Sequence, residues 1–166
     1  FNGTEPTSKL FYLGGKRSNS IQSHAYLTNG PANDDFIAYI WHNVPGLQKF
    51  GTYEGNGTDA GPFIETGFRP ALVWTRAYSA NSNNNSHWLI YDTLLNPNNE
   101  AEQILYANLT NGQGSHSSIG IDILANGFKL KADSSGYSNY NGWSYIYCAW
   151  AEAPAFNLYG AQSTAR

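Results

Sequence analysis

Short apolar and aromatic runs alternate with turn residues along most of the chain. Each run is four to nine residues long and is bounded by Gly, Pro or Asn. Runs of this length and composition are typical of short β-strands in a sandwich or barrel. The pattern predicts strands at residues 9–13, 25–28, 36–43, 48–53, 71–77, 87–92, 103–106, 119–124, 127–131 and 143–151.

Helical periodicity is nearly absent. The exception is residues 98–105, where Asn98 or Asn99 could cap one turn of helix, and an irregular loop is the alternative. The chain is therefore expected to be all-β.

Two Asn-Gly pairs indicate tight turns. Asn56-Gly57 and Asn126-Gly127 suit turns whose backbone needs positive φ. The second pair lies between residues 121–124 and 128–130, which both alternate apolar and polar side chains. It predicts a β-hairpin.

One long pattern occurs twice. Residues 35–45, DFIAYIWHNVP, and residues 144–154, SYIYCAWAEAP, share an aromatic-rich run with a Trp, three residues and a Pro. A period of about 110 residues fits whole domains in tandem rather than solenoid units. We predict the C-terminal half of a preceding repeat at residues 1–46, a complete β-sandwich repeat at 47–156 and a tail at 157–166, as a piece of a longer polypeptide.

The final strand is apolar on both faces. Alternation places Ile146, Cys148 and Trp150 on one face and Tyr145, Tyr147 and Ala149 on the other. We therefore predict that Trp41, Trp88 and Trp150 are core residues. Cys148 is expected to be a small buried hydrophobe.

The composition limits the classes of molecule that the chain is expected to bind. Charged residues make up 13% of the chain, about half the usual share, while aromatic residues make up 15%. The surface must then owe its polarity to Asn, Ser, Thr and Gly. With a net charge of −3, the chain is not expected to have the basic surface that nucleic-acid binding requires. No apolar run approaches the roughly 20 residues of a membrane span.

No catalytic or metal-binding set is apparent. The histidines are scattered, without a His-x-x-x-His pair or a Gly-x-Ser-x-Gly elbow. The carboxylates that a glycosidase would need are available in principle at Glu65, Asp92, Asp122 and Glu152, but Asp92 and Asp122 are expected to accept hydrogen bonds at strand ends. Asp34-Asp35 and Asp59 are more typical of solvated turns than of calcium loops. We predict no enzyme, no metal and no cofactor.

Aromatic residues among asparagines are the more informative feature. Sugars present apolar C–H faces that stack on flat rings, while their hydroxyls bond to Asn, Asp and Ser. We predict ligand binding by Tyr137, Tyr140, Trp74 and His87. Tyr137 and Tyr140 lie in a Gly/Ser/Asn loop and are expected to be exposed.

Four motifs, in order, carry a family resemblance: FGTYEGNGTDAGPFIETGFRPALVWTR, HWLIYD, IDILANGFKL and YIYCAWAEAP. Residues 47–156 resemble a tandem β-repeat domain of tailed-bacteriophage virion proteins, often found beside a concanavalin-like module in tail-fibre or tail-associated proteins. Residues 1–45 resemble the closing half of a related copy. Trp74 and the long Asn-rich loop at 81–85 depart from that pattern. The family offers no catalytic residues that can be carried over.

The resemblance and the residues together predict an antiparallel, jelly-roll-like β-sandwich with an N-terminal partial repeat. Its expected role is a structural or adhesive module of a virion fibre or tail protein, extracellular and used in host attachment. We expect a homo-oligomer, with a trimer favoured, that contacts other virion proteins and a host-surface glycan. Alternatives are a carbohydrate-binding receptor module, a capsid decoration protein and, less favoured, a polysaccharide depolymerase.

Overall fold

The structure is a computed structural model that describes residues 39–79, 86–131 and 137–153. The strands predicted at residues 9–13 and 25–28 lie outside the described residues, as do the Asn-rich loop and the tail. The chain divides between Trp41 and His42 into two units. The sandwich belongs to the second unit.

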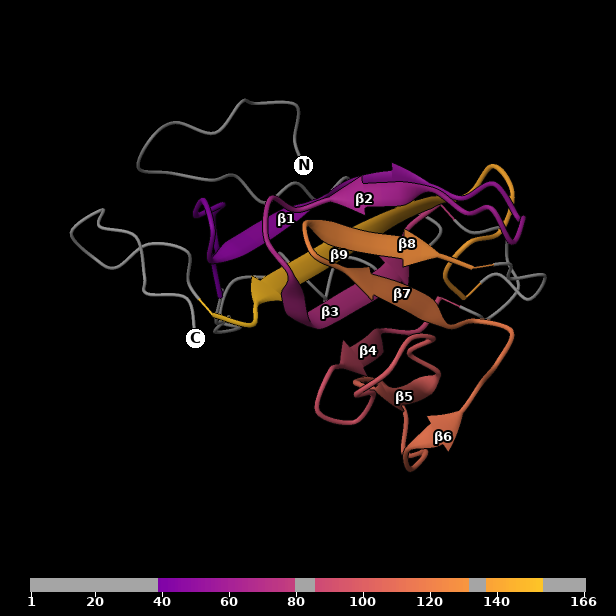
Figure 1. Cartoon of the computed structure of the whole chain (residues 1–166). Helices are drawn as coiled ribbons and strands as arrows, with labels where there is room; N and C mark the ends of the chain where they lie inside the picture. The colour runs from indigo at the N-terminus through magenta and orange to yellow at the C-terminus, as the bar shows by residue number, and fades with distance from the viewer. Residues whose placement is uncertain (1–38, 80–85, 132–136, 154–166) are drawn as a thin grey trace, which may run out of the picture. The chain divides into compact units, whose positions relative to one another are not determined.

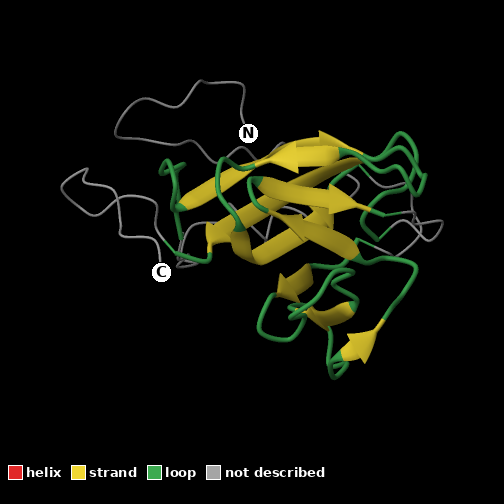
Figure 2. Cartoon of the chain, in the orientation of Figure 1, coloured by secondary structure: helices red, strands yellow, loops and turns green. Residues whose placement is uncertain are grey.

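In the described part of the chain, nine strands form two antiparallel sheets that pack face to face (Figure 1). The larger sheet has the order β1 (Gln48–Glu54), β9 (Ser144–Ala151), β3 (Pro70–Ala77), β4 (Leu89–Asp92), β5 (Gln103–Tyr106) and β6 (Gly114–Ser115). The smaller sheet has the order β2 (Phe63–Glu65), β8 (Gly127–Leu130) and β7 (Ile121–Leu124). The described residues form strands and loops without a helix (Figure 2), so the predicted all-β sandwich is confirmed.

The two sheets share one hydrophobic core. The larger sheet contributes Val73, Tyr147 and Ala149, and the smaller sheet contributes Phe128 and Leu130, all buried. Burying a side chain of this size stabilises the fold by about 1.5–3 kcal/mol. β9 lies between β1 and β3 because both of its faces are apolar and suit a central position.

Sequence patterning located the long strands and missed the shortest ones. The segment predicted at residues 103–106 coincides with β5, and six others overlap β1, β3, β4, β7, β8 and β9 within a few residues. β2 and β6 were not predicted. With three and two residues, they are too short to display an alternating pattern.

The strand predicted at residues 36–43 is wrong for its described part. Residues 39–43 form no strand, and Trp41 is 58% exposed rather than in the core. Its counterpart Trp150 lies in β9 with a strand on each side, whereas residues 39–43 take part in no strand pairing among the described residues. Most of the first copy lies outside the described residues, and the repeat stays a prediction.

The segment that enters the sandwich covers part of its edge. Val44 and Gln48 exchange two backbone hydrogen bonds of 2.9 and 3.0 Å, and Asn43 Oδ1 accepts one from the Phe50 amide at 2.7 Å. These bonds pair part of the open edge of β1 within its own chain. On the side of β9, the Leu47 carbonyl accepts a hydrogen bond from the Ala151 amide at 2.8 Å, which extends the β1–β9 ladder.

The hairpin predicted from Asn126-Gly127 is confirmed, with its turn one residue earlier. Leu124 pairs with Gly127, so the two-residue turn is Ala125-Asn126 and Gly127 already belongs to β8. Gly127 does not have the expected positive φ. A Cβ on Gly127 would collide with the Ile64 carbonyl of β2, so glycine permits the close approach of two strands.

The helical alternative for residues 98–105 is wrong, and asparagine side chains explain why. Asn96 donates to the Gln103 carbonyl at 2.9 Å and accepts from the Gln103 amide at 2.8 Å. Asn99 does the same with Ile123, at 3.0 and 2.9 Å. These side chains form hydrogen bonds with the backbone of Gln103 and Ile123. The bonds hold the loop between β4 and β5 in a non-helical conformation.

Asn139 is a buried polar anchor at one end of the sandwich. Its side-chain nitrogen lies within hydrogen-bond distance of the Lys131 carbonyl (2.8 Å), the Thr58 carbonyl (3.1 Å) and Asn56 Oδ1 (3.2 Å). Its side-chain oxygen accepts from the Asn56 amide at 2.9 Å, and its main-chain carbonyl accepts from Gly57 at 2.8 Å. Gly57 has φ 66°, as its Asn-Gly pair predicted. One fully buried side chain thus joins three segments.

We predict that Asn139→Ala lowers the free energy of unfolding by about 2–4 kcal/mol, because backbone groups of Asn56, Thr58 and Lys131 lose the buried side chain that joins them. Urea unfolding followed by fluorescence measures this change. The control is Asn111→Ala at an exposed asparagine, expected within about 0.5 kcal/mol of the parent. Equal effects of the two substitutions would show that Asn139 is not an anchor.

Candidate functional site

Four aromatic rings from distant segments meet at one end of the sandwich. His87 precedes β4, Tyr106 ends β5, His116 follows β6 and Tyr137 lies between β8 and β9. His87 lies 6.0 Å from Tyr106 and 6.0 Å from Tyr137, measured between ring centroids, and Tyr106 lies 6.0 Å from His116 and 6.5 Å from Tyr137. We call these four residues the ring cluster.

Strand pairing brings the ring cluster together. β4 and β5 run antiparallel with Leu89 opposite Tyr106, so the start of one strand meets the end of the other. Tyr106 and Tyr137 also pack against the hydrophobic core. The rings are therefore held by the body of the sandwich while part of each remains accessible.

Uncharged hydrogen-bonding groups surround the rings. The Asn108 side-chain nitrogen lies 3.2 Å from Nδ1 of His87, and its oxygen accepts from the Trp88 amide at 2.9 Å. The Tyr106 hydroxyl lies 3.3 Å from Nε2 of His116. Residues 107–113 beside them are exposed throughout. The site thus presents flat rings next to amides and hydroxyls.

Two of the four predicted ligand-binding residues, His87 and Tyr137, come together in the ring cluster. Tyr140 instead contacts Trp143, at 4.7 Å between ring centroids, and Trp74 lies in the larger sheet. Tyr140 is 40% exposed, as predicted, but Tyr137 is half-buried. Sequence reasoning missed Tyr106 and His116 as partners because only the strand pairing places them there. Ligand binding itself stays a prediction.

The outer face of the larger sheet is a second surface of interest. Eight of its outward side chains are apolar and half-buried: Phe50, Leu72, Trp74, Ile90, Leu105, Ile146, Cys148 and Trp150. We call this set the outer apolar face.

Aromatic contacts run across the outer apolar face. Ring centroids lie 5.7 Å apart for Phe50 and Trp150, 5.6 Å for Trp150 and Trp74, and 6.3 Å for Trp74 and Trp88. The Arg76 guanidinium lies 5.6 Å from the centre of the Trp88 ring. Trp88 and Trp150 were predicted as core. They are half-buried on this face and lie outside the core between the sheets.

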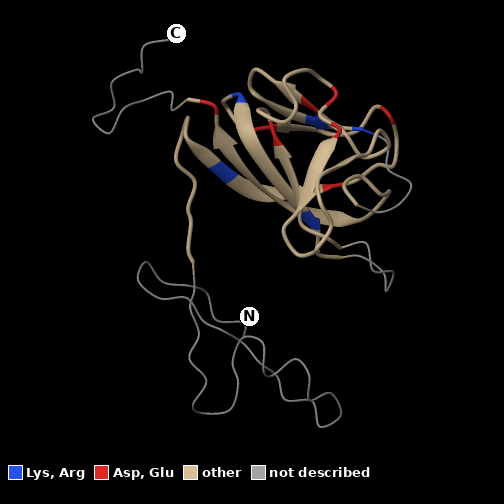
Figure 3. Ribbon diagram, turned by 90° about the horizontal axis from the view of Figure 1, so that it is seen from below, with Lys and Arg blue, Asp and Glu red and all other residues tan. Residues whose placement is uncertain are grey.

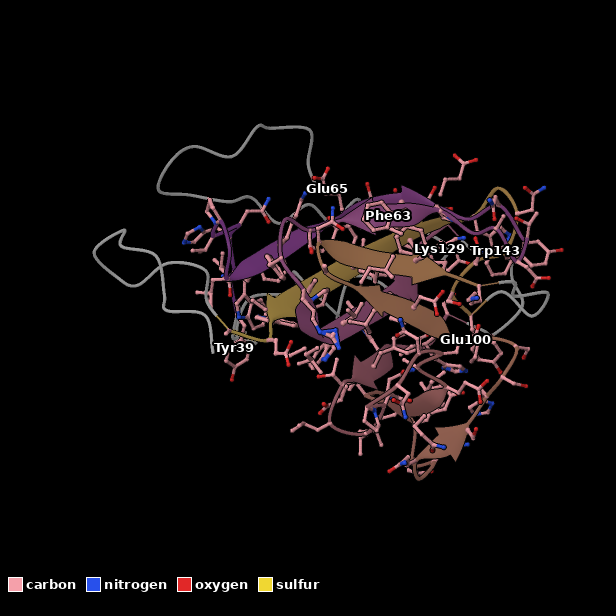
Figure 4. The ribbon with its side chains drawn as sticks, in the orientation of Figure 1. Tyr39, Phe63, Glu65, Glu100, Lys129 and Trp143 are labelled. Atoms are coloured by element: carbon pink, nitrogen blue, oxygen red, sulfur yellow. The ribbon has the colours of Figure 1, made fainter. Side chains whose placement is uncertain are left out.

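The smaller sheet has a different outer face. Phe63, Glu65 and Lys129 lie there (Figure 4), with Asp122 opposite Lys129 on the next strand. Phe63 and Glu65 are exposed. This sheet alternates apolar inward and largely polar outward, as expected of a sheet with one solvated face. The larger sheet lacks that alternation.

The candidate carboxylates have structural contacts on separate elements. Glu152 pairs with Arg69 at 3.0 Å, and Asp122 pairs with Lys131 at 3.3 Å. Asp92 accepts from the Leu94 amide at 2.8 Å, as predicted, whereas the ion pair of Asp122 was not foreseen. Within the described residues, no three His, Cys, Asp or Glu side chains form a group that could hold a metal ion.

Charged side chains are few and scattered over the described strands and loops (Figure 3). Burial raises the pKa of the half-buried Cys148 thiol, which therefore stays protonated at neutral pH. Burial also raises the pKa of the Tyr147 hydroxyl. No described segment is a helix with the length and apolar character that crossing a membrane requires.

A model of a domain of unknown function, DUF7483, matches residues 1–154 of the chain. No curated protein and no solved structure matches.

We predict a pH-dependent contribution from Lys131. The hydrogen bond to Asp122, then the charges of Asp122 and Glu100, raise its pKa above the ordinary value of 10.5. A group whose pKa is higher in the folded state than in the unfolded state stabilises the folded protein. This stabilisation is complete at pH values below the unfolded-state pKa, and it is lost as the pH rises through the folded-state pKa. Lys131→Met should therefore lower the melting temperature slightly at pH 8, and the difference should shrink above about pH 10.5.

The control is Lys129→Met, two residues away in β8. Thermal unfolding of the parent and both variants at several pH values separates the effect of Lys131 from the titration of Tyr147 and Cys148, which all three proteins share. A constant difference across this range would contradict the assignment.

Proposed function

The chain belongs to the DUF7483 family, and we propose that it is a structural and adhesive module of a fibre or tail protein in a tailed-bacteriophage virion. The resemblance of residues 47–156 to phage virion repeats supports this role. So does the low share of charged residues, 13%, because surfaces with few charges are easier to desolvate in a permanent assembly.

The observation that carries the proposal is the outer apolar face. A sheet that is apolar on both faces is typical of one that is covered on both faces. The smaller sheet covers the inner face only, where Val73, Tyr147 and Ala149 are buried. The half-buried outward side chains on the opposite side, with three tryptophan rings on or beside them, suit a packing surface.

A second copy of this chain is the partner that we propose. The face carries few charges, and both signs are present among its outward positions, with Arg76 on β3, Asp92 on β4 and Glu54 at the end of β1. Such a surface is compatible with symmetric self-association, and phage fibres are usually homotrimers. Another virion protein on the same face is the alternative outcome.

We predict that the chain self-associates and that Ile90→Lys weakens this association about tenfold or more, because a charge is placed within an apolar contact. Ile90 projects outward from β4 opposite Trp74. Gel filtration with light scattering over a range of concentrations measures the assembly. Circular dichroism confirms that the variant folds.

The matched control is Phe63→Lys, which adds the same charge at an exposed apolar position of β2, on the outer face of the smaller sheet. It should leave the assembly unchanged. A monomer at high concentration, or equal effects of the two lysines, would count against self-association. Immunogold labelling of purified virions would then distinguish a fibre or tail module from capsid decoration.

A further inference from the structure

We infer that the ring cluster is a binding site for an uncharged saccharide. The inference rests on the proposed adhesive function and locates this function at the ring cluster. It adds Tyr106 and His116 to the predicted His87 and Tyr137, and it excludes Tyr140 and Trp74 from the site.

The rings have the properties that sugar stacking requires. A pyranose presents C–H groups on one face, and these pack against the flat face of an aromatic ring. His87, Tyr106 and Tyr137 are each half-buried. Tyr106 and Tyr137 are fixed by packing against the core, and His87 is fixed by its contacts with both rings and with Asn108. Fixed rings bind with little loss of side-chain entropy.

The groups beside the rings suit sugar hydroxyls. Asn108 is exposed, yet its side chain is oriented by contacts with His87 at 3.2 Å and Trp88 at 2.9 Å. The exposed segment that follows carries Thr110, Asn111 and Gln113. Amide and hydroxyl groups both donate and accept hydrogen bonds, as sugar hydroxyls do.

The scarcity of charge among the described residues at the ring cluster defines the class of saccharide. All ion pairs between described residues lie elsewhere, at Arg69–Glu152 and around Lys131. The four rings and Asn108 include no Arg or Lys to bind a uronate or sialate carboxylate. The nearby Arg76 guanidinium is engaged by the Ser86 carbonyl at 3.2 Å and lies over the Trp88 ring. A neutral hexose or N-acetylhexosamine therefore fits better than an acidic sugar.

The other predicted aromatic residues have structural roles. Trp143, the partner of Tyr140, belongs to a small core cluster with Ala77 and Tyr145. Trp74 packs between Trp88 and Trp150 on the outer apolar face. Neither joins the ring cluster.

A glycan array with neutral and acidic oligosaccharides, probed with the whole chain, tests the inference. The strongest neutral hit is then titrated by saturation-transfer NMR against the parent and four variants, His87→Ala, Tyr137→Leu, Tyr140→Ala and the control Tyr78→Ala. His87→Ala and Tyr137→Leu should each weaken binding about tenfold, because an aromatic contact of about 1.4 kcal/mol corresponds to that ratio. Tyr137→Leu keeps an apolar side chain against the core. Tyr78→Ala, at a tyrosine that is 59% exposed after β3, is the matched control and should leave binding unchanged.

Asn108→Ala, at an exposed position, replaces either ring variant if that variant fails to fold. No binding to any neutral oligosaccharide, binding to acidic oligosaccharides alone, or equal affinities of parent and ring variants would overturn the inference. Loss of binding in Tyr140→Ala but not in His87→Ala would move the site to the other loop and overturn it too. Self-association with no glycan binding would refute this site alone, whereas glycan binding by a monomer would refute the assembly part of the proposed function.

Discussion

The buried amide of Asn139 is the constraint on which one end of the sandwich depends. The chain has a single cysteine, so no disulfide within the chain fixes the loops, and the charges are few. Among the described residues only Lys131, with Asp122 and Glu100, forms an ion-pair network. Amide side chains fix other loops. Asn96, Asn99 and Asn108 repeat what Asn139 does, each giving the backbone of another segment a partner that strand pairing does not supply. The asparagine content of the described sandwich is therefore part of its framework as well as of its turns.

The fold could be predicted where one strand carried enough residues to show its pattern. β9 and β3 have eight residues each and lie close to their predicted positions. β2 and β6 are too short for this. The prediction for Trp41 was wrong because an aromatic-rich run indicates the capacity to pair, whereas pairing itself requires neighbouring strands that the run does not encode.

The sequence predicted only two of the four residues of the ring cluster, for a related reason. His87 and Tyr137 were selected for their chemistry and their polar surroundings, and they do meet. Tyr106 and His116 complete the ring cluster through the register of β4 with β5 and of β5 with β6. Alternation along β9 correctly predicted two apolar faces. Which of these faces meets the second sheet is settled by packing, which a single strand cannot specify.

The hydrogen bond between Leu47 and Ala151 has a mechanical consequence. The chain enters β1 and leaves β9 at the same corner, where Gln48 lies opposite Trp150. Tension applied at that corner would load the rungs of the β1–β9 ladder one after another, like a zipper, rather than all at once in shear. A module with this arrangement lies beside the line of force and unfolds at low force. Rigidity against pulling would then have to come from the neighbours that pack on it.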